Sequence, residues 1–528
     1  MHNRWSPRRE LTKQEQWLMK RLVRTGKLFG FLREHRHELF DEAFQSELDA
    51  AYRDTGAGRA PVPPALMAMA VLLQAYEGAS DAKAVEMTVV DLRWQMVLDR
   101  LGATETAFSQ GTLCDFRHRM IRHDLDRRLL ERTVELAKRG KGFDWKKIPN
   151  TLRLAVDSSP LEGAGRVEDT INLLAHAARN VINCVAAVLS WSPAEVAQKA
   201  GAPLLVETSI KKALDREWSD PEQKAAAIVA LSEQLDALEQ WIARALPHHM
   251  DEPPLATHLE TLRQLRDQDL EPDPSGGGSR IRDGVAPDRR VSVADKDMRH
   301  GRKSKSKRFN GYKRHIATDL DTRLILACAI TPANRPEAEA APELVADIGR
   351  ALPARRVGSL HIDRGYIASE LVTDLLARSC DVLCKPWVPR NGKLFTKADF
   401  KLDMRSLTLT CPAGETERFT PGSVVEFDPE ACARCPLRAR CTMAAAGSGR
   451  TVSIAEDERL QHRLRKLVAS PGGRERLRER VAVEHSLAHV GRKQGRRARY
   501  CGGRNNLFDL RRAAAVVNLE TVHRAMAA

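Results

Sequence analysis

The spacing at which apolar residues recur changes near residue 150, and this change limits the folds open to the chain. Before that point apolar residues recur every three or four positions, for example over 63–73, a spacing that predicts amphipathic helices. From residue 152 to Asp157 they alternate with polar or small residues, which predicts a strand that ends on an acid. We therefore expect an all-α N-terminal domain over 1–148 and a sheet-containing domain over 149–528.

Strand patterns alternate with helix patterns along the second domain. After the first strand, the expected strands cover 309–317, 323–330, 357–363 and 380–385, and the expected helices cover 336–352, 367–378 and 474–490. Such alternation is typical of a mixed α/β sheet with helices on its faces. The expected core comprises 149–165, 290–387 and 474–528. A helical insert over 166–289 and a cysteine-containing insert over 388–473 interrupt it.

The positive charge of the chain is concentrated in two segments. Its 85 Lys and Arg outnumber its 70 Asp and Glu, for a net charge of +15. Residues 299–314 carry +8 and residues 474–512 carry another +8, so the remainder sums to −1. Such patches indicate a polyanion partner, although a solubilising face or a targeting signal has the same composition. The candidate DNA contacts in these segments are Arg302, Lys303, Lys305, Lys307, Arg308, Lys313, Arg480, Arg492, Lys493, Arg496 and Arg497.

Three acids stand at informative positions in this pattern. Asp157 ends the first predicted strand, Asp363 ends the fourth, and Glu484 lies on the last predicted helix, one turn after Arg480. Acids that follow neighbouring parallel strands meet at one edge of the sheet, and crowded carboxylates favour a bound cation. The set therefore predicts a site for Mg²⁺ or Mn²⁺, with two ions, that acts on phosphodiester bonds. Taken singly, each acid is more typical of a cap or a surface ion pair.

Hydropathy and cysteine content favour a cytoplasmic protein without a membrane partner. No apolar run approaches the ~20 residues of a membrane span, and the first residues lack an apolar signal region. Ten cysteines are too few for a disulfide scaffold. In the second insert, Cys411, Cys432, Cys435 and Cys441 form the pattern Cys-x20-Cys-x2-Cys-x5-Cys. This spacing suits either a structural Zn²⁺ site or four free thiols.

Several longer motifs follow one another along the chain. They are Asp157-Ser-Ser-Pro160, Phe309-Asn-Gly-Tyr-Lys313, Thr331-Pro-Ala-Asn334, Asp363-Arg-Gly-Tyr366 and the segment from Arg480 through Glu484 to Leu519. This order resembles the DDE transposases of bacterial insertion sequences. The first 140 residues are similar to the InsH-type helical domain found in one group of them, notably at Phe108-Ser-Gln-Gly-Thr-Leu113. The chain departs from the usual pattern at Leu477 and Gly491, where related transposases often carry a tyrosine and a lysine.

The resemblance implies a ribonuclease-H-like catalytic core in which Asp157, Asp363 and Glu484 form a metal-binding catalytic triad. It implies that water frees a 3′-hydroxyl at the end of the mobile element, and that this hydroxyl then attacks target DNA. The implied partners are double-stranded DNA, as terminal inverted repeats and as target, and a second copy of the chain in a synaptic complex at the bacterial nucleoid. Two alternative hypotheses are a catalytically inactive DNA-binding regulator and a ribonuclease-H-like nuclease without strand transfer.

Overall fold

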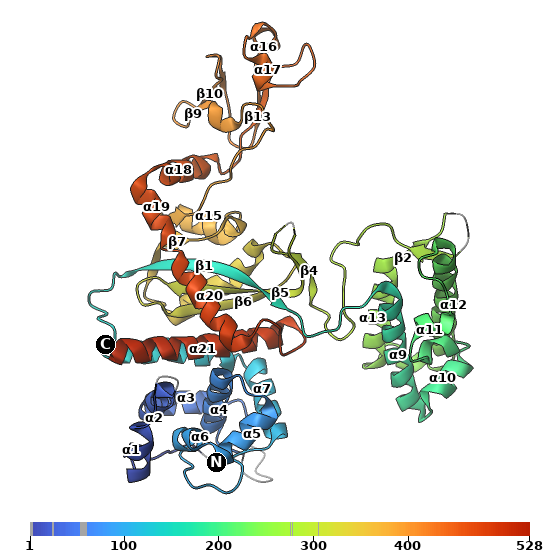
Figure 1. The fold of residues 1–528 in the computed structure, drawn as a ribbon, viewed down its shortest axis with the longest axis vertical. Helices are drawn as coiled ribbons and strands as arrows, with labels where there is room; N and C mark the ends of the chain where they lie inside the picture. Colours follow the sequence, from blue (N-terminus) through green and yellow to red (C-terminus); the bar gives the residue numbers. More distant parts are fainter. Residues whose placement is uncertain are drawn as a thin grey trace.

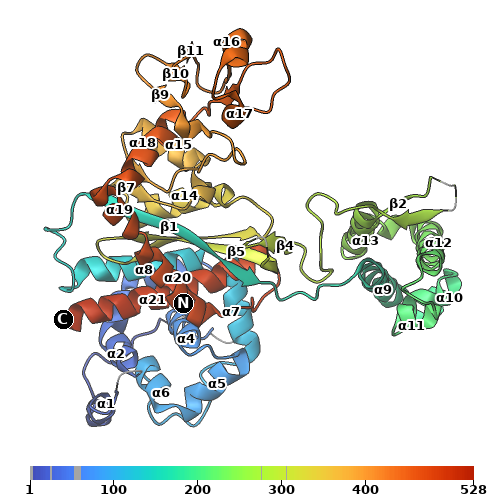
Figure 2. The same ribbon diagram turned by 45° about the horizontal axis from the view of Figure 1, so that its top comes forward.

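A central sheet, surrounded by helices, carries two projecting inserts (Figure 1). The computed structural model describes residues 4–23, 26–52, 61–274, 276, 278–304 and 306–527. The N-terminal helices lie together on one side of the sheet, and the inserts leave it in different directions (Figure 2). The predicted helical N-terminal region and mixed sheet are confirmed, and together they fit a ribonuclease-H-like core.

Polar caps define where several N-terminal helices begin. Asp41, Ser80 and Ser109 each accept a hydrogen bond from the backbone N–H three residues further along, at 3.0 to 3.2 Å. Between them, α4 is apolar on all sides and is buried along most of its length. The helices are α1 (Lys13–Met19), α2 (Lys27–Leu39), α3 (Glu42–Asp49), α4 (Pro64–Glu77), α5 (Asp81–Val90), α6 (Leu92–Leu98), α7 (Gln110–Arg122) and α8 (Leu125–Arg139).

The central sheet has the strand order β4-β5-β1-β7-β8, and β6 also pairs with β5. β1 runs antiparallel to β5 and parallel to β7. The sequence did not predict β4, because its residues, Arg-His-Gly-Arg, have no apolar pattern. The strands are β1 (Thr151–Glu162), β4 (Arg299–Arg302), β5 (Arg308–Asp319), β6 (Ile325–Pro332), β7 (Arg356–His361) and β8 (Asp381–Leu383).

Strand β1 continues well beyond Asp157, so the prediction that this acid ends its strand is wrong. β5 pairs with β1 from Leu154 to Glu162 and keeps the backbone extended past the acid. The parallel pairing with β7 stops earlier, where Ala155 lies opposite His361. Asp157 therefore stands where the neighbouring strand ends, in the middle of its own strand.

Helix α21 (Gly503–Ala527) lies between the N-terminal helices and the sheet (Figure 1). Fifteen of its residues are buried, because α4 and α8 pack on it from one side and β6 from the other. The amide of Asn518 accepts a hydrogen bond from the N–H of Ile325 in β6 at 2.7 Å. It also donates to the carbonyl of Ile325 and to the hydroxyl of Thr133 in α8, both at 2.9 Å. One continuous apolar core thus runs through both regions.

The remaining core helices surround the sheet and its edge. They are η3 (Glu337–Ala340), α14 (Ala341–Ala351), η4 (Arg364–Tyr366), α15 (Glu370–Ala377), α19 (Pro471–Arg478) and α20 (Val481–Gln494). The single helix expected over 474–490 is therefore two, with a break before Arg480. Arg480 keeps right-handed helical dihedrals, φ −57° and ψ −24°, so its spacing to Glu484 is preserved.

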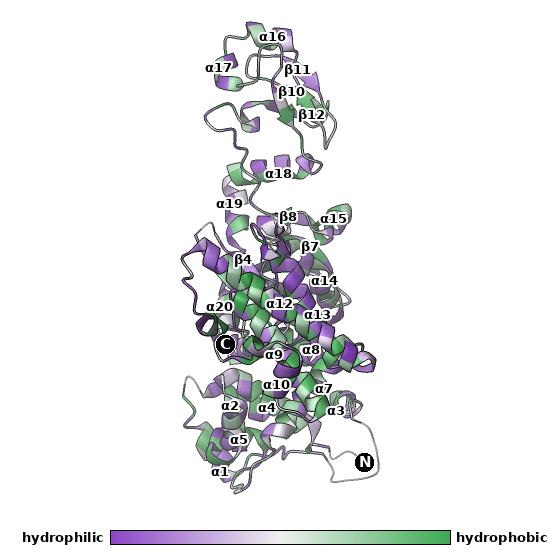
Figure 3. Cartoon of the chain, turned by 90° about the vertical axis from the view of Figure 1, so that its right-hand side faces the viewer, coloured by the Kyte–Doolittle hydropathy of each residue, from purple (hydrophilic) through white to green (hydrophobic). Residues whose placement is uncertain are grey.

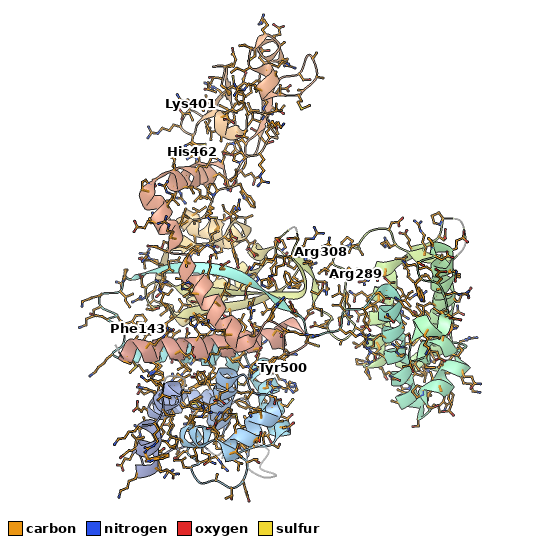
Figure 4. The ribbon with its side chains drawn as sticks, viewed as in Figure 1. Phe143, Arg289, Arg308, Lys401, His462 and Tyr500 are labelled. Atoms are coloured by element: carbon orange, nitrogen blue, oxygen red, sulfur yellow. The ribbon has the colours of Figure 1, made fainter. Side chains whose placement is uncertain are left out.

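The helical insert has a separate apolar core. It consists of α9 (Thr170–Leu189), α10 (Pro193–Lys199), η1 (Pro203–Val206), α11 (Ile210–Leu214), α12 (Pro221–Ala245), η2 (Pro247–His249), α13 (Leu255–Asp269) and the hairpin β2 (Leu270–Pro272)–β3 (Ser279–Ile281). Its helices carry apolar faces, drawn in green in Figure 3. Among the described helices, α9 alone has the length and composition of a membrane span, but its apolar face packs within the insert. Where the insert joins the core, Arg289, which is labelled in Figure 4, donates a hydrogen bond to Asp269 at 2.7 Å.

The cysteine-containing insert is small and poor in regular structure. Its buried core has seven side chains, among them Phe400, Phe419 and Phe427. It contains η5 (Lys397–Asp399), β9 (Lys401–Asp403), β10 (Thr408–Thr410), β11 (Thr416–Arg418), β12 (Val424–Glu426), α16 (Pro429–Arg434), α17 (Arg438–Cys441) and β13 (Thr451–Ser453). Helix α18 (Glu458–Ala469) leads back to the core.

Replacing Asn518 with alanine tests the link between the N-terminal helices and the sheet. The change leaves the buried N–H and carbonyl of Ile325 without these partners, at a cost of about 1–3 kcal/mol for each unsatisfied group. We expect Asn518→Ala to lower the denaturant midpoint for the N-terminal region and the sheet together. Thr521→Ala is the control, since Thr521 bonds only within its own helix. Equal midpoints for the two variants would show that the link is unimportant.

Candidate active site

The register of β1 and β7 brings Asp157 and Asp363 together. Two residues beyond the last parallel pair, Ala155 and His361, the two chains reach Asp157 and Asp363. Asp363 precedes η4, where its Oδ1 accepts the N–H of Arg364 at 2.7 Å. The Oδ1 of Asp157 accepts the N–H of Ser158 at 2.8 Å. Both carboxylates therefore lie at the edge where ligands bind in open α/β sheets.

Helix α20 brings Glu484 to the same edge, and Arg480 connects it to Asp157. The Arg480 guanidinium donates from Nη1 to Oδ2 of Asp157 at 2.7 Å and from Nη2 to Oε1 of Glu484 at 2.6 Å. The carboxylate of Asp157 is 14% exposed and that of Glu484 is 46% exposed. One guanidinium thus lies between two of the three predicted catalytic acids.

Burial raises the pKa of Asp157, and the nearby charges of Asp363 and Glu484 raise it further. Arg480 and the N–H of Ser158 oppose this shift because they stabilise the ionised carboxylate. The three acids therefore interact electrostatically, and a cation in their midst is favourable. In the structure Arg480 supplies that positive charge.

The acids face a cleft of about 670 Å³ that is lined mainly by polar groups. Four further cations line it with Arg480, namely Arg302, Lys303, Lys313 and Arg314. Sequence reasoning missed Arg314, although it lies in the first basic segment. Its guanidinium donates to the side chain of Gln494 and to the carbonyl of Gly495, both at 3.0 Å, which fixes it against the end of α20.

The other predicted DNA contacts that the structure describes do not line this cleft. Arg308, labelled in Figure 4, and Arg497 line another cavity, beside Glu162 at the end of β1. Arg496 pairs with Glu162 at 3.0 Å, and Lys493 pairs with Glu520 of α21 at 2.9 Å. Lys307 and Arg492 are exposed on the surface, and Lys305 lies outside the described residues.

A buried polar chain supports the edge from behind. His315 contacts the hydroxyl of Tyr366 through Nδ1 at 2.7 Å and that of Thr331 through Nε2 at 2.8 Å. Tyr366 is also bonded to Ser158, whose hydroxyl donates to Glu337. Sequence reasoning missed Glu337, because its position on η3 follows from the turn after β6 rather than from any strand pattern. These hydrogen bonds thus connect Ser158, which follows Asp157, with Tyr366, which lies three residues after Asp363.

The three acids do not form a finished metal centre in this structure. Among the described residues, no group of three or more His, Cys, Asp or Glu side chains is arranged so that it could hold a metal ion. For the acids the reason is visible, since Arg480 stands between Asp157 and Glu484. Their oxygen atoms are nevertheless the donors that Mg²⁺ and Mn²⁺ prefer.

Parallel strands that deliver two aspartates beside a helical glutamate, in a cationic cleft, define a class of proteins that act on nucleic-acid phosphates. A family model described as Transposase DDE domain matches residues 278–519, and one described as Transposase domain (DUF772) matches residues 21–119. The chain belongs to the insertion-sequence DDE transposases with an N-terminal transposase domain. Asp363 and Glu484 fall within the first match, and Asp157 precedes it. Comparisons with curated proteins and with solved structures gave no match.

The buried histidine predicts an acid-sensitive fold. Burial lowers the pKa of His315 from 6.5 to about 3, so the unfolded chain takes up a proton below pH 6.5 that the folded chain excludes. The free energy of unfolding therefore falls with decreasing pH over this window, by up to about 1.4 kcal/mol per pH unit from this group. We expect His315→Gln to have a shallower acid slope in denaturant titrations. His118→Gln, on the exposed face of α7, is expected to keep the wild-type slope. Equal slopes for all three proteins would contradict this assignment.

Proposed function

We propose that this transposase cleaves DNA at the ends of its insertion sequence and joins the freed 3′-hydroxyl to target DNA. The observation that carries the proposal is the approach of Asp157, Asp363 and Glu484 to one another in a single cleft with five cations. Carboxylates suit a divalent metal, and cations suit the phosphates of the substrate. The DDE domain places the chain in a family that generally uses divalent metals.

The metal ligands would be the carboxylates of Asp157, Asp363 and Glu484, which would bind two Mg²⁺ or Mn²⁺ ions. Such ions, when bound, activate the attacking oxygen and stabilise the leaving oxygen of an in-line displacement. Arg480 would then leave the two carboxylates that it now bridges, and its guanidinium would become available to a phosphate. Lys313, which enters the cleft from β5, would hold the DNA backbone against the acids, and the buried Arg314 would add positive charge to the cleft wall.

The presence of three carboxylates within the cationic cleft argues against an inactive regulator. A regulator that only binds DNA has no need of three mutually repelling carboxylates within its basic cleft. The geometry of the site does not distinguish a transposase from a nuclease without strand transfer, since both reactions use the same acids. Only an assay of the reaction products distinguishes them. Strand transfer requires a second DNA, and we propose that two chains bring two terminal repeats together in a synaptic complex.

The N-terminal helices, which share an apolar core with the sheet, would bind the terminal repeats. Lys493 and Arg499, in the second basic segment, contact the carbonyls of Tyr76 and Ala79 at 3.3 Å. The ring of Tyr500, labelled in Figure 4, lies under the guanidinium of Arg117 of α7 at 5.0 Å. DNA held by these helices would therefore have a fixed position relative to Glu484.

Isosteric changes of the three acids test the proposed chemistry. We expect Asp157→Asn, Asp363→Asn and Glu484→Gln to lower Mg²⁺-dependent cleavage of a plasmid carrying the element's ends, because each removes a charged metal ligand. The loss should exceed the roughly 10–100-fold typical of outer groups around a metal. Asp381→Asn, at the start of β8, is the matched control and should retain activity.

The same assay separates the proposed function from its alternatives. Full activity in all three variants would rule out catalysis by these acids. Pre-cleaved ends that yield no joined product, while intact ends are still cut, would identify a nuclease without strand transfer. Specific binding of the ends without any cleavage, in Mg²⁺ or in Mn²⁺, would identify a regulator.

We also propose that the cysteine-containing insert binds structural Zn²⁺. Cys411, Cys432, Cys435 and Cys441 line one cavity of about 290 Å³, and three of them pack against the small core. The N–H of Arg450 points at the sulfur of Cys432 at 3.5 Å, a contact that stabilises a thiolate. All four are free cysteines, and metal binding would draw them closer together. A core of seven side chains is small, so a metal would supply stability that packing does not.

Metal analysis of the purified chain tests the zinc proposal. We expect one Zn²⁺ per chain in wild type and loss of the metal in a Cys432→Ser/Cys435→Ser variant. That variant should also be cleaved faster by protease within 388–473, because the insert loses its cross-link. Cys114→Ser, on α7, should leave the metal content unchanged. Metal-free protein with a protease-resistant insert would rule out the site.

A further inference from the structure

Two ion pairs of opposite polarity join β1 to the junction of α19 and α20. Arg480 donates to Asp157 at 2.7 Å. The preceding residue, Glu479, accepts a hydrogen bond from Nη2 of Arg153 at 2.5 Å. Arg153 and Asp157 are four residues apart on β1, so both side chains leave the same face of the sheet. Two adjacent residues of opposite charge thus hold the junction to one face of β1, where α20 crosses the strand (Figure 1).

The carboxylate of Glu479 also lies beside β7, the strand that leads to Asp363. One of its oxygen atoms, Oε2, is 3.5 Å from Nε2 of His361, a side chain that is 2% exposed. Arg153 has a further partner in Asp321, which accepts from its Nη1 at 3.0 Å. Glu479 therefore contacts both strands that bring the proposed metal-binding aspartates together.

Glu479 itself does not line the cleft of the three acids. Its backbone is helical, with φ −57° and ψ −26°, and it connects α19 to α20. The carboxylate of Glu484 is 46% exposed, so its place beside the aspartates depends on where α20 lies on the sheet. At the other end of α20, Arg314 donates to Gln494 at 3.0 Å. Contacts at both ends of this helix thus determine the position of Glu484.

Only one of the two ion pairs would survive metal binding. If Asp157 and Glu484 bind a metal, Arg480 leaves both carboxylates, and its ion pair with β1 is lost. The pair of Arg153 with Glu479 includes none of the proposed ligands, so it remains when the metal is bound. Both of its side chains are 36% exposed, and such pairs contribute little to stability, so we do not expect its loss to unfold the protein.

We propose that Glu479 is a positioning residue for the metal site. Through Arg153 and His361 it holds the start of α20 on the sheet, so that Glu484 stays beside the two aspartates. This contact is needed most when Arg480 leaves its carboxylates, because the other ion pair with β1 is then absent. The inference rests on the proposed function, since it concerns the metal-bound protein.

Mn²⁺ binding to the full chain, without DNA, tests the proposal. Free Mn²⁺ is measured by its electron paramagnetic resonance signal, so no cleavage is needed. We expect Glu479→Ala to weaken Mn²⁺ binding about tenfold, as is usual for groups that orient metal ligands. Arg153→Ala should weaken it by a similar factor, and the double variant should be no weaker than either, because the two residues act as one unit. Glu475→Ala, at an exposed position of α19, is the matched control and should bind Mn²⁺ as wild type does.

The Arg153→Ala variant separates positioning from simple electrostatics. Loss of a positive charge near the acids raises their affinity for a cation, whereas displacement of Glu484 lowers it. Unchanged or tighter binding in Arg153→Ala would therefore overturn the proposal, as would unchanged binding in Glu479→Ala. Losses that add in the double variant would show that the two residues act separately, for example with Glu479 as a direct ligand, and would also overturn it.

The Asp157→Asn variant identifies the site to which Mn²⁺ binds. Binding that is lost in Asp157→Asn but unchanged in Arg153→Ala would overturn the inference alone. Binding that is unchanged in Asp157→Asn would overturn the proposed metal site, and the inference with it. Thermal unfolding verifies the fold of each variant, and Glu479→Gln or Arg153→Gln replaces any variant that melts early. Glu479→Gln keeps an oxygen atom that accepts from Arg153, so its loss of affinity should be smaller than that of Glu479→Ala.

Discussion

The parallel pairing of β1 with β7 is the constraint on which the candidate active site depends. A shift of one residue in this register would turn Asp157 toward the opposite face of the sheet. The long antiparallel pairing with β5 prevents such a shift, since it holds β1 from Leu154 to Glu162. Pairing with β5 thus fixes the register of β1, and pairing with β7 places Asp363 beside Asp157. Helix α20 then needs only to cross β1 for Glu484 to complete the group.

Arg480 reconciles this group of acids with a stable fold. Burial raises the pKa of Asp157, and its two acidic neighbours raise it further, so the cluster without a cation would favour protonation. The guanidinium donates to both Asp157 and Glu484, and its charge opposes the rise in the pKa of Asp157. A divalent ion would compete with an internal cation rather than fill an empty space, and its affinity would include the cost of displacing that arginine.

Local sequence patterns predicted the type of sheet and several residues of the cleft. They did not predict the features that depend on pairing between strands distant in the sequence. The alternation from residue 152 and the later strand patterns predicted the mixed sheet. The basic segments predicted cations near the acids, and the cleft is lined by four of the predicted residues, Arg302, Lys303, Lys313 and Arg480. The middle position of Asp157 in β1 could not be predicted, because it depends on a partner strand about 160 residues away, as the pair Asp157–Ile316 shows. Strand β4 was not predicted because its extended conformation depends on pairing with β5 and not on a pattern in its own residues. The positions of Arg314 and Glu337 also depend on tertiary contacts, with Gln494 and Ser158.

Helix α21 has a consequence for the order in which the protein can be made. The N-terminal helices leave the ribosome before α21, yet their apolar surface is covered by this helix, which lies more than 350 residues later in the chain. Until α21 emerges, the sheet lacks the same partner, so neither part can reach its final packing alone. Folding of both is therefore delayed until α21 has been synthesised. A nascent chain that lacks α21 would expose part of an unfinished core, whereas the helical insert, which has its own core, could pack before α21 is made.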